Sequence, residues 1–231
     1  MIKYNVIVLA AGQGKRMNVG KNKQFIELLK EPLIIHTLKK FIQDKWCQNI
    51  YLVINPNEQN QMEELIATYQ WQNQITFVPG GKERQESGYN GLLAISEEQQ
   101  DMVVMIHDGA RPFVEEAHLH ELAHAAKEKK AALIAVPVTD TIKRKKGDRI
   151  ETLDRSTLWA AQTPQAFDYQ LIKEAHEQAK ATDYLGTDDV SLVEALGEPV
   201  DIVQGTYQNV KLTTPEDIMR AEMILERQEE K

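Results

Sequence analysis

The chain has 231 residues, enough for one domain with a sizeable core, and 42% of them are hydrophobic. Its formal net charge of −8 argues against general nucleic-acid binding, so any cationic cluster must be local and suited to small anions. The single cysteine excludes an internal disulfide, and no apolar run is long enough to span a bilayer. The first residues read as a strand and not as a signal peptide. We therefore expect a cytoplasmic protein with one domain over residues 1–231 and no membrane partner.

Apolar, β-rich runs alternate with helical patterns along the first 140 residues. Strands are predicted at 4–10, 49–55, 75–79, 102–107 and 132–138, all nearly continuous apolar runs of the kind that is buried on both faces of a parallel sheet. Amphipathic helices are predicted after Pro32 and around 119–126. The alternation predicts a Rossmann-like α/β fold, an open and mainly parallel sheet with helices on both faces. Ligands of such sheets bind beyond the carboxyl ends of the strands.

The alternation stops after residue 138, where a charged stretch follows. Its pattern on both sides of Gly147 predicts a β-hairpin, an arm at about 139–158 that projects from the domain. Hairpins are rarely stable alone in water, so we expect a homodimer joined through the arm. Beyond it, helices are expected at 171–179, from Asp188 and from Pro215, with strands near 200–203 and 209–212.

The stretch VLAAGQGKRMNVGKNKQF follows the first predicted strand. Gly12 and Gly14 predict a loop that can approach phosphate oxygens closely. The spacing matches neither the Walker A loop nor the dinucleotide fingerprint, because Arg16 and Met17 stand where those motifs need other residues. A tight turn with solvated lysines fits the spacing equally well. The cations Arg16 and Lys23 favour binding of a triphosphate.

Two further stretches follow predicted strands. In GGKERQES, Gly81 allows close backbone approach, and a plain loop before a helix is the alternative. In MIHDGARPF, Asp108 ends the fourth strand, where ligand groups lie in this fold class. A carboxylate beside a triphosphate indicates Mg²⁺, which prefers oxygen ligands. His107 is expected to be structural.

Together these stretches resemble the cytidylyltransferases that activate sugar or polyol phosphates, over essentially the whole chain. The branch that acts on 2-C-methyl-D-erythritol 4-phosphate is the most similar. The resemblance implies transfer of CMP from CTP to that substrate, with release of pyrophosphate and formation of 4-diphosphocytidyl-2-C-methyl-D-erythritol, in non-mevalonate isoprenoid precursor biosynthesis. One departure is Asn22, where the family often has proline, and it is expected to loosen the loop.

The resemblance also implies roles for individual residues. Arg16 and Lys23 would act at the reacting phosphoryl group. The nucleotide would contact Ala10, Ala11, Gly12, Gly14, Gly81, Ser87 and Asp108, with Asp108 also holding Mg²⁺. The polyol phosphate would lie near Arg111, Thr141, Arg155, Thr163, Thr187 and Lys211. For Arg155 taken alone, a surface ion pair is the alternative, and for Thr187 a helix cap.

Two other functions fit parts of the pattern. Ribitol 5-phosphate cytidylyltransferases run the same chemistry, but Ala10-Ala11-Gly12 and Asp108-Gly109-Ala110-Arg111 favour the methylerythritol branch. A nucleotide-binding regulator without turnover is the alternative from another class. A protein that only holds a nucleotide would not need a second set of residues to bind phosphate at a distance from the first.

Overall fold

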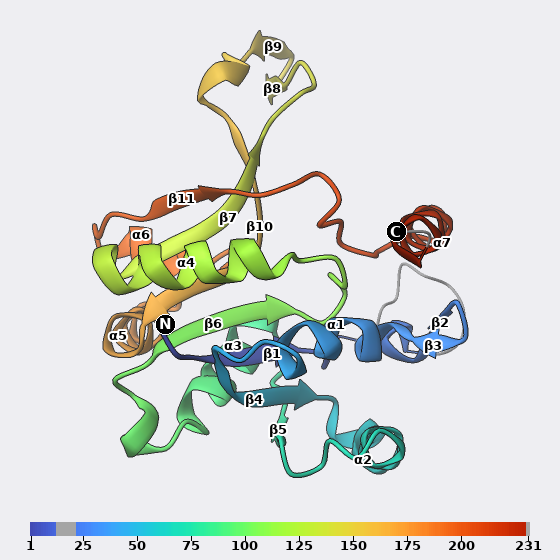
Figure 1. The fold of residues 1–231 in the computed structure, drawn as a ribbon. Helices are drawn as coiled ribbons and strands as arrows, with labels where there is room; N and C mark the ends of the chain where they lie inside the picture. Colours follow the sequence, from blue (N-terminus) through green and yellow to red (C-terminus); the bar gives the residue numbers. More distant parts are fainter. Residues whose placement is uncertain (13–21, 230–231) are drawn as a thin grey trace.

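The computed structural model describes residues 1–12 and 22–229. Gly14 and Arg16, to which the sequence assigned phosphate contacts, lie outside the described residues. A seven-stranded sheet with the order β11-β7-β10-β6-β1-β4-β5 forms the centre (Figure 1). Its strands are β1 (Tyr4–Leu9), β4 (Cys47–Ile54), β5 (Ile75–Pro79), β6 (Val103–Asp108), β7 (Ala131–Pro137), β10 (Trp159–Asp168) and β11 (Asp201–Gln204).

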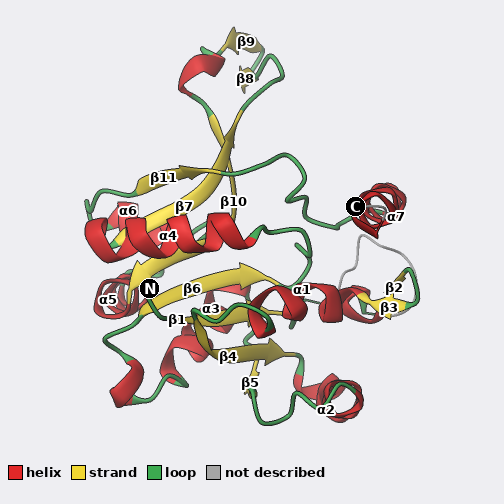
Figure 2. Cartoon of the chain, viewed as in Figure 1, coloured by secondary structure: helices red, strands yellow, loops and turns green. Residues whose placement is uncertain are grey.

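Helices cover both faces of this sheet (Figure 2). They are α1 (Leu33–Ile42), α2 (Gln59–Thr68), α3 (Arg84–Leu93), α4 (Glu116–Lys129), α5 (Tyr169–Ala181), α6 (Asp189–Ala195) and α7 (Pro215–Glu229). A short hairpin of β2 (Glu27–Leu28) and β3 (Glu31–Pro32) precedes α1. Within the described ranges, no helix combines the length and the apolar character that crossing a membrane requires.

Alternating side chains of the strands build two separate cores. Val6 and Val8 of β1 pack with α1 and α4 on one face, whereas Ile7 packs with α3, α5 and α6 on the other. Because both faces are covered, the central strands are apolar at nearly every position. The predicted Rossmann-like class with helices on both faces is confirmed.

Two features of the strands differ from the sequence-based prediction: β10 is a strand that was not predicted, and the short strand predicted at 209–212 does not form. β10 runs antiparallel between β6 and β7, and its pairing with β7 shifts register between Ala161 and Gln165. The stretch contains Pro164, whose nitrogen donates no hydrogen bond, and no strand was predicted there from the sequence. The prediction of a strand at 209–212 is wrong: the segment forms no strand, although Leu212 N donates to Ala110 O in the loop after β6 at 2.8 Å.

The predicted hairpin arm is present. Its strands β8 (Lys143–Lys146) and β9 (Arg149–Thr152) pair antiparallel around Gly147, whose φ of +59° suits glycine. Figure 1 shows the arm extending from the ends of β7 and β10, away from the sheet. Every residue of β8 and β9 is exposed, so the arm has no core of its own.

Candidate active site

A cavity of about 300 Å³ lies at the carboxyl ends of β1, β5 and β6. This is the edge at which ligands bind in open α/β sheets. Seven of the residues predicted from the sequence line it: Ala11, Gly12, Lys23, Gly81, Ser87, Asp108 and Lys211. They come from five separate segments of the chain, so the fold brings together what the sequence keeps apart.

The first wall of the cavity is the loop after β1. Ala10 is buried, its amide donates to Val53 O at 2.8 Å, and the chain then turns into the cavity at Ala11 and Gly12. Among the described residues, a Cβ added to Gly12 would meet no atom within 4 Å. A ligand can therefore approach the backbone closely at this position.

Lys23 begins a short 3-10 helix, Lys23–Phe25, that is capped by Asn22. Asn22 Oδ1 accepts from the Gln24 amide at 3.1 Å, and its Nδ2 donates to Glu58 Oε2 at 2.5 Å. Asn22, the residue expected to loosen the loop, is itself buried and hydrogen-bonded through both side-chain atoms, and a loosening of the loop stays a prediction. Lys23 Nζ donates to Leu212 O at 3.4 Å, which joins the first wall to the segment that carries Lys211.

The second wall is the loop between β5 and α3. The Gly81 amide donates to Ser87 Oγ at 3.0 Å, and Ser87 Oγ donates to Glu83 O at 3.0 Å. A Cβ on Gly80 would lie 2.3 Å from the Ala11 Cβ, so this loop and the loop after β1 pack at a distance that only glycine allows. Gly81 and Ser87 are thus held beside Gly12, as a shared nucleotide site requires.

Asp108 is the last residue of β6, and three cations surround its carboxylate. Lys211 Nζ lies 2.7 Å from Oδ2, Arg84 Nε lies 3.4 Å from Oδ1, and Arg111 Nε lies 3.8 Å from Oδ2. Burial opposes ionisation, but Arg84, Lys211 and Arg111 together hold the pKa of Asp108 well below its ordinary range. The cavity therefore contains a permanent carboxylate and an excess of positive charge.

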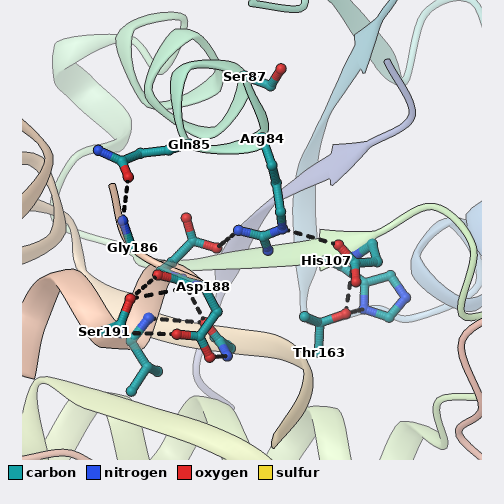
Figure 3. Close-up of polar contacts among 12 residues, drawn as sticks. Arg84, Gln85, Ser87, His107, Thr163, Gly186, Asp188 and Ser191 are labelled. Atoms are coloured by element: carbon teal, nitrogen blue, oxygen red, sulfur yellow. Dashed lines mark hydrogen bonds and ion pairs between the residues drawn. The ribbon is translucent and has the colours of Figure 1, made fainter. Parts of the chain in front are cut away.

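Arg111 and Thr163 support Asp108 from behind. The Asp108 amide donates to Thr163 Oγ1 at 3.0 Å, and Arg111 Nη1 donates to Asn209 O at 2.7 Å. His107 is fully buried between them, with Nε2 3.0 Å from Arg111 O and Nδ1 3.3 Å from Thr163 Oγ1 (Figure 3). Burial lowers the pKa of His107 to about 4, so it is neutral near pH 7, as expected for a structural histidine. Arg111 and Thr163 contact Asp108, which lines the cavity, but they do not line the cavity themselves.

Three predicted substrate residues lie elsewhere on the surface. Thr141 and Arg155 are exposed in the arm, where Arg155 Nη1 donates to Thr139 O at 2.6 Å. Thr187 is exposed in the loop before α6. None of the three lines the cavity formed by the described part of this chain.

The sequence did not single out Arg84, which lines the cavity and pairs with both Asp108 and Asp189. The signal was present in GGKERQES, because the first residue of a helix that follows a strand and a glycine pair points toward the ligand edge. Asp189 gave no such signal: it stands beside Asp188, the helix cap, and resembles part of the same cap.

Asp108 can supply one oxygen ligand to a divalent cation. Its carboxylate is ionised and lies in a cavity that also receives cationic side chains, which suits Mg²⁺ sites built from one or two carboxylates and substrate phosphates. A different group, Asp44, Glu116 and His120, holds three potential metal ligands within 4.8 Å of one another. In this group, Asp44 Oδ2 accepts a hydrogen bond from the Tyr4 hydroxyl at 2.6 Å. Tyr4 begins β1, whereas the cavity lies where β1 ends, so the two sites are at opposite ends of the strand.

Known proteins match this chain over nearly its full length. The profile described as 2-C-methyl-D-erythritol 4-phosphate cytidylyltransferase (IspD) matches residues 4–227. The chain belongs to this family. It is 59% identical to the 2-C-methyl-D-erythritol 4-phosphate cytidylyltransferase of Geobacillus thermodenitrificans, over 97% of each chain, and 54% identical to that of Halalkalibacterium halodurans, over 99% of each.

The cytidylyltransferase fold matches as well. The crystal structure of 4-diphosphocytidyl-2C-methyl-D-erythritol synthase from Anaerococcus prevotii superposes with a TM-score of 0.86 at 32% identity, covering 97% of this chain and 96% of that one. The enzyme from Thermus thermophilus gives 0.77 at 29% identity, covering 95% and 98%. The resemblance stated from the sequence motifs is thereby confirmed.

Proposed function

We propose that this chain transfers the cytidylyl group of CTP to 2-C-methyl-D-erythritol 4-phosphate, releasing pyrophosphate and forming 4-diphosphocytidyl-2-C-methyl-D-erythritol. Membership of the cytidylyltransferase family over residues 4–227 is the observation that carries the proposal. The names of the relatives favour this substrate over ribitol 5-phosphate and favour an enzyme over a regulator. The product belongs to isoprenoid precursor biosynthesis.

The reaction joins two anions. A phosphate oxygen of the polyol phosphate attacks the α-phosphorus of CTP in line, a new P–O–P bond forms, and the bond to the β-phosphate oxygen breaks. The nucleophile is already ionised, so the protein need not remove a proton. Catalysis then requires that the protein overcome the repulsion between the two anionic substrates. It must also stabilise the negative charge that develops on the α-phosphoryl oxygens.

The cavity contains groups suited to both tasks. Lys23 and the loop of Gly12 would meet the triphosphate, while Gly81 and Ser87 would contact the base or nearby nucleotide atoms. Lys211 also lines the cavity and would receive the phosphate of the second substrate. The predicted role of Arg16 at the reacting phosphoryl group stays a prediction, as does that of Gly14.

Mg²⁺ is the proposed cofactor, with Asp108 as its protein ligand. The ion would supply positive charge to the phosphates. Lys211 and Arg84 keep Asp108 ionised and oriented, so that an oxygen ligand is present before nucleotide arrives.

The arm completes the proposal. We place Thr141 and Arg155 on the polyol phosphate, but they lie outside the cavity of their own chain. A homodimer in which the arm of one subunit reaches the cavity of its partner reconciles their role with their position. One domain over 1–231 with this arm, acting in the cytoplasm, is part of the same proposal.

A pyrophosphate-release assay tests the proposal with CTP, ATP and UTP, each with either polyol phosphate. We expect turnover with CTP and 2-C-methyl-D-erythritol 4-phosphate. Turnover with ribitol 5-phosphate in its place would establish the sister activity. CTP binding without pyrophosphate release under any combination would establish the regulator and overturn the proposal.

A further inference from the structure

Arg84 bridges two carboxylates from different parts of the fold. It is the first residue of α3, and it contacts Asp108 at the end of β6 and Asp189 at the start of α6. Nη1 lies 2.8 Å from Asp189 Oδ2, whereas Nε lies 3.4 Å from Asp108 Oδ1 (Figure 3). The guanidinium therefore pairs closely with Asp189, outside the cavity, and only loosely with Asp108, which lines the cavity.

Asp189 is a buried charge that helix capping does not explain. Its side chain is 1% exposed, and the cap of α6 is the neighbouring Asp188, which accepts from the Ser191 amide at 3.0 Å. Burial opposes ionisation of Asp189, yet Arg84 and then His176, 3.4 Å away, keep its pKa below the ordinary value. A carboxylate is retained at so buried a position only when a cation pairs with it.

The backbone that carries Asp189 is fixed independently of Arg84. Gln165 Oε1 on β10 accepts from the amides of Asp189 and Val190 at 3.1 and 3.0 Å. Gln85 Oε1 on α3 accepts from the Gly186 amide at 2.9 Å (Figure 3). The segment is thus anchored to the sheet and to the helix that bears Arg84, and its carboxylate is a fixed point against which the guanidinium can be held.

We propose that Asp189 is a positioning residue for this enzyme: it holds the Arg84 guanidinium back from Asp108 and so keeps Asp108 available to the nucleotide. Without that restraint, the guanidinium would close on Asp108 as a two-point pair, the geometry that arginine prefers with a carboxylate. The proposal rests on the proposed function, because it takes CTP as the occupant of the cavity.

The test replaces Asp189 with its neutral isostere. In Asp189→Asn, we expect the KM for CTP to rise about tenfold, with a smaller change in kcat and none in the KM for the polyol phosphate. Asp188→Asn is the matched control. It removes the same charge from the adjacent residue, but the Asp188 carboxylate pairs with the Ser191 amide and with Gln165 Nε2, whereas Arg84 pairs with Asp108 and Asp189. Its KM for CTP should remain at the wild-type value.

A second background shows whether the effect passes through Arg84. In Arg84→Gln, adding Asp189→Asn should leave the KM for CTP where Arg84→Gln alone puts it, because the restrained group is gone. An effect of Asp189→Asn that persists in this background would overturn the proposal, as would an equal rise in Asp188→Asn. Melting temperatures of all four proteins separate a loss of fold from a loss of positioning.

Two additions keep the outcome decisive. If Asp189→Asn does not fold, Gly88→Ala replaces it: the new Cβ would lie 3.2 Å from Asp189 Oδ1 and displaces the carboxylate without changing charge, so a rise in the KM for CTP is again expected. CTP binding measured by calorimetry makes the same comparisons without turnover. An inactive wild-type protein would therefore overturn the proposed function and leave the test of Asp189 intact.

Discussion

The cavity at the carboxyl edge of the sheet and the projecting arm contribute to the same proposed reaction in opposite ways. Side chains around Asp108 are buried or half-buried and are held by several partners, from Thr163 behind it to Lys211 beside it. In β8 and β9 every residue is exposed, and the pairs that hold the hairpin together, such as Arg144 with Glu151 at 2.7 Å, lie in solvent. The described side chains of the cavity are held by contacts within one chain, whereas the arm has no core of its own, and we propose that a second subunit fixes it.

This difference separates two kinds of functional residue. Groups in the cavity should respond to substitution through the nucleotide and the chemical step, since their positions do not depend on another subunit. Groups in the arm should respond through assembly and through the second substrate. Four experiments follow, beginning with the largest expected effect.

Replacing Lys23 with alanine should lower kcat by about three orders of magnitude, because it removes one preorganised charge that we propose to act at the reacting phosphoryl group. The fold should persist, since Lys23 lies at the rim of a sheet whose core it does not enter. Pyrophosphate release and far-UV circular dichroism measure the two quantities. Lys129→Ala, on the exposed end of α4, is the charge control. A near-wild-type kcat in Lys23→Ala would place the chemistry elsewhere.

Deleting residues 143–152 tests the arm. The Leu153 amide donates to Ile142 O at 3.0 Å, so two glycines can close the gap without strain on the sheet. Activity should fall by about two orders of magnitude or more, since Arg155 loses its place, and sedimentation should show a monomer with a normal melting temperature. Arg144→Ala, which removes only the exposed pair with Glu151, should change neither. A deletion variant that stays dimeric and active would assign the arm no role.

The buried histidine behind the cavity gives a pH test. Its pKa is about 4 in the folded protein and near 6.5 when unfolded, so the unfolded state takes up the proton first as the pH falls. Stability from His107 is therefore complete above pH 6.5 and declines toward pH 4, by about 2 kcal/mol between pH 7 and pH 5. Urea unfolding at these two values measures the slope. His107→Gln should remove that share, and an unchanged slope in the variant would show that the pKa of His107 is the same in the folded and unfolded states.

The same division explains what the sequence could predict. The strands and their ligand edge follow from periodicity, and motifs after strands located Gly81, Ser87 and Asp108 in one cavity. Periodicity is a local property, so it also identified the hairpin around Gly147.

What the sequence missed depends on contacts between distant segments. The partnership of Arg84 with Asp189 joins residues more than a hundred positions apart, and nothing local distinguishes Asp189 from the capping residue before it. Lys211 was expected on a strand, but its segment is held instead by Leu212 and by Asn209, whose Nδ2 donates to Thr163 O at 3.0 Å. Tertiary hydrogen bonds of this kind leave no periodic trace in the sequence.

The smallest expected effect separates ligand approach from folding. A Cβ at Gly12 would meet no atom of residues 1–12 or 22–229 within 4 Å, whereas one at Gly80 would lie 2.3 Å from the Ala11 Cβ. Gly12→Ala should therefore leave the melting temperature unchanged and raise the KM for CTP about tenfold, because the methyl group occupies space that the phosphates need. Gly80→Ala should lower the melting temperature, since two loops must separate to admit it. Thermal unfolding and CTP titration distinguish the two glycines. An unaltered KM in Gly12→Ala would mean that the nucleotide does not approach the backbone there, and the triphosphate would have to be assigned to another wall of the cavity.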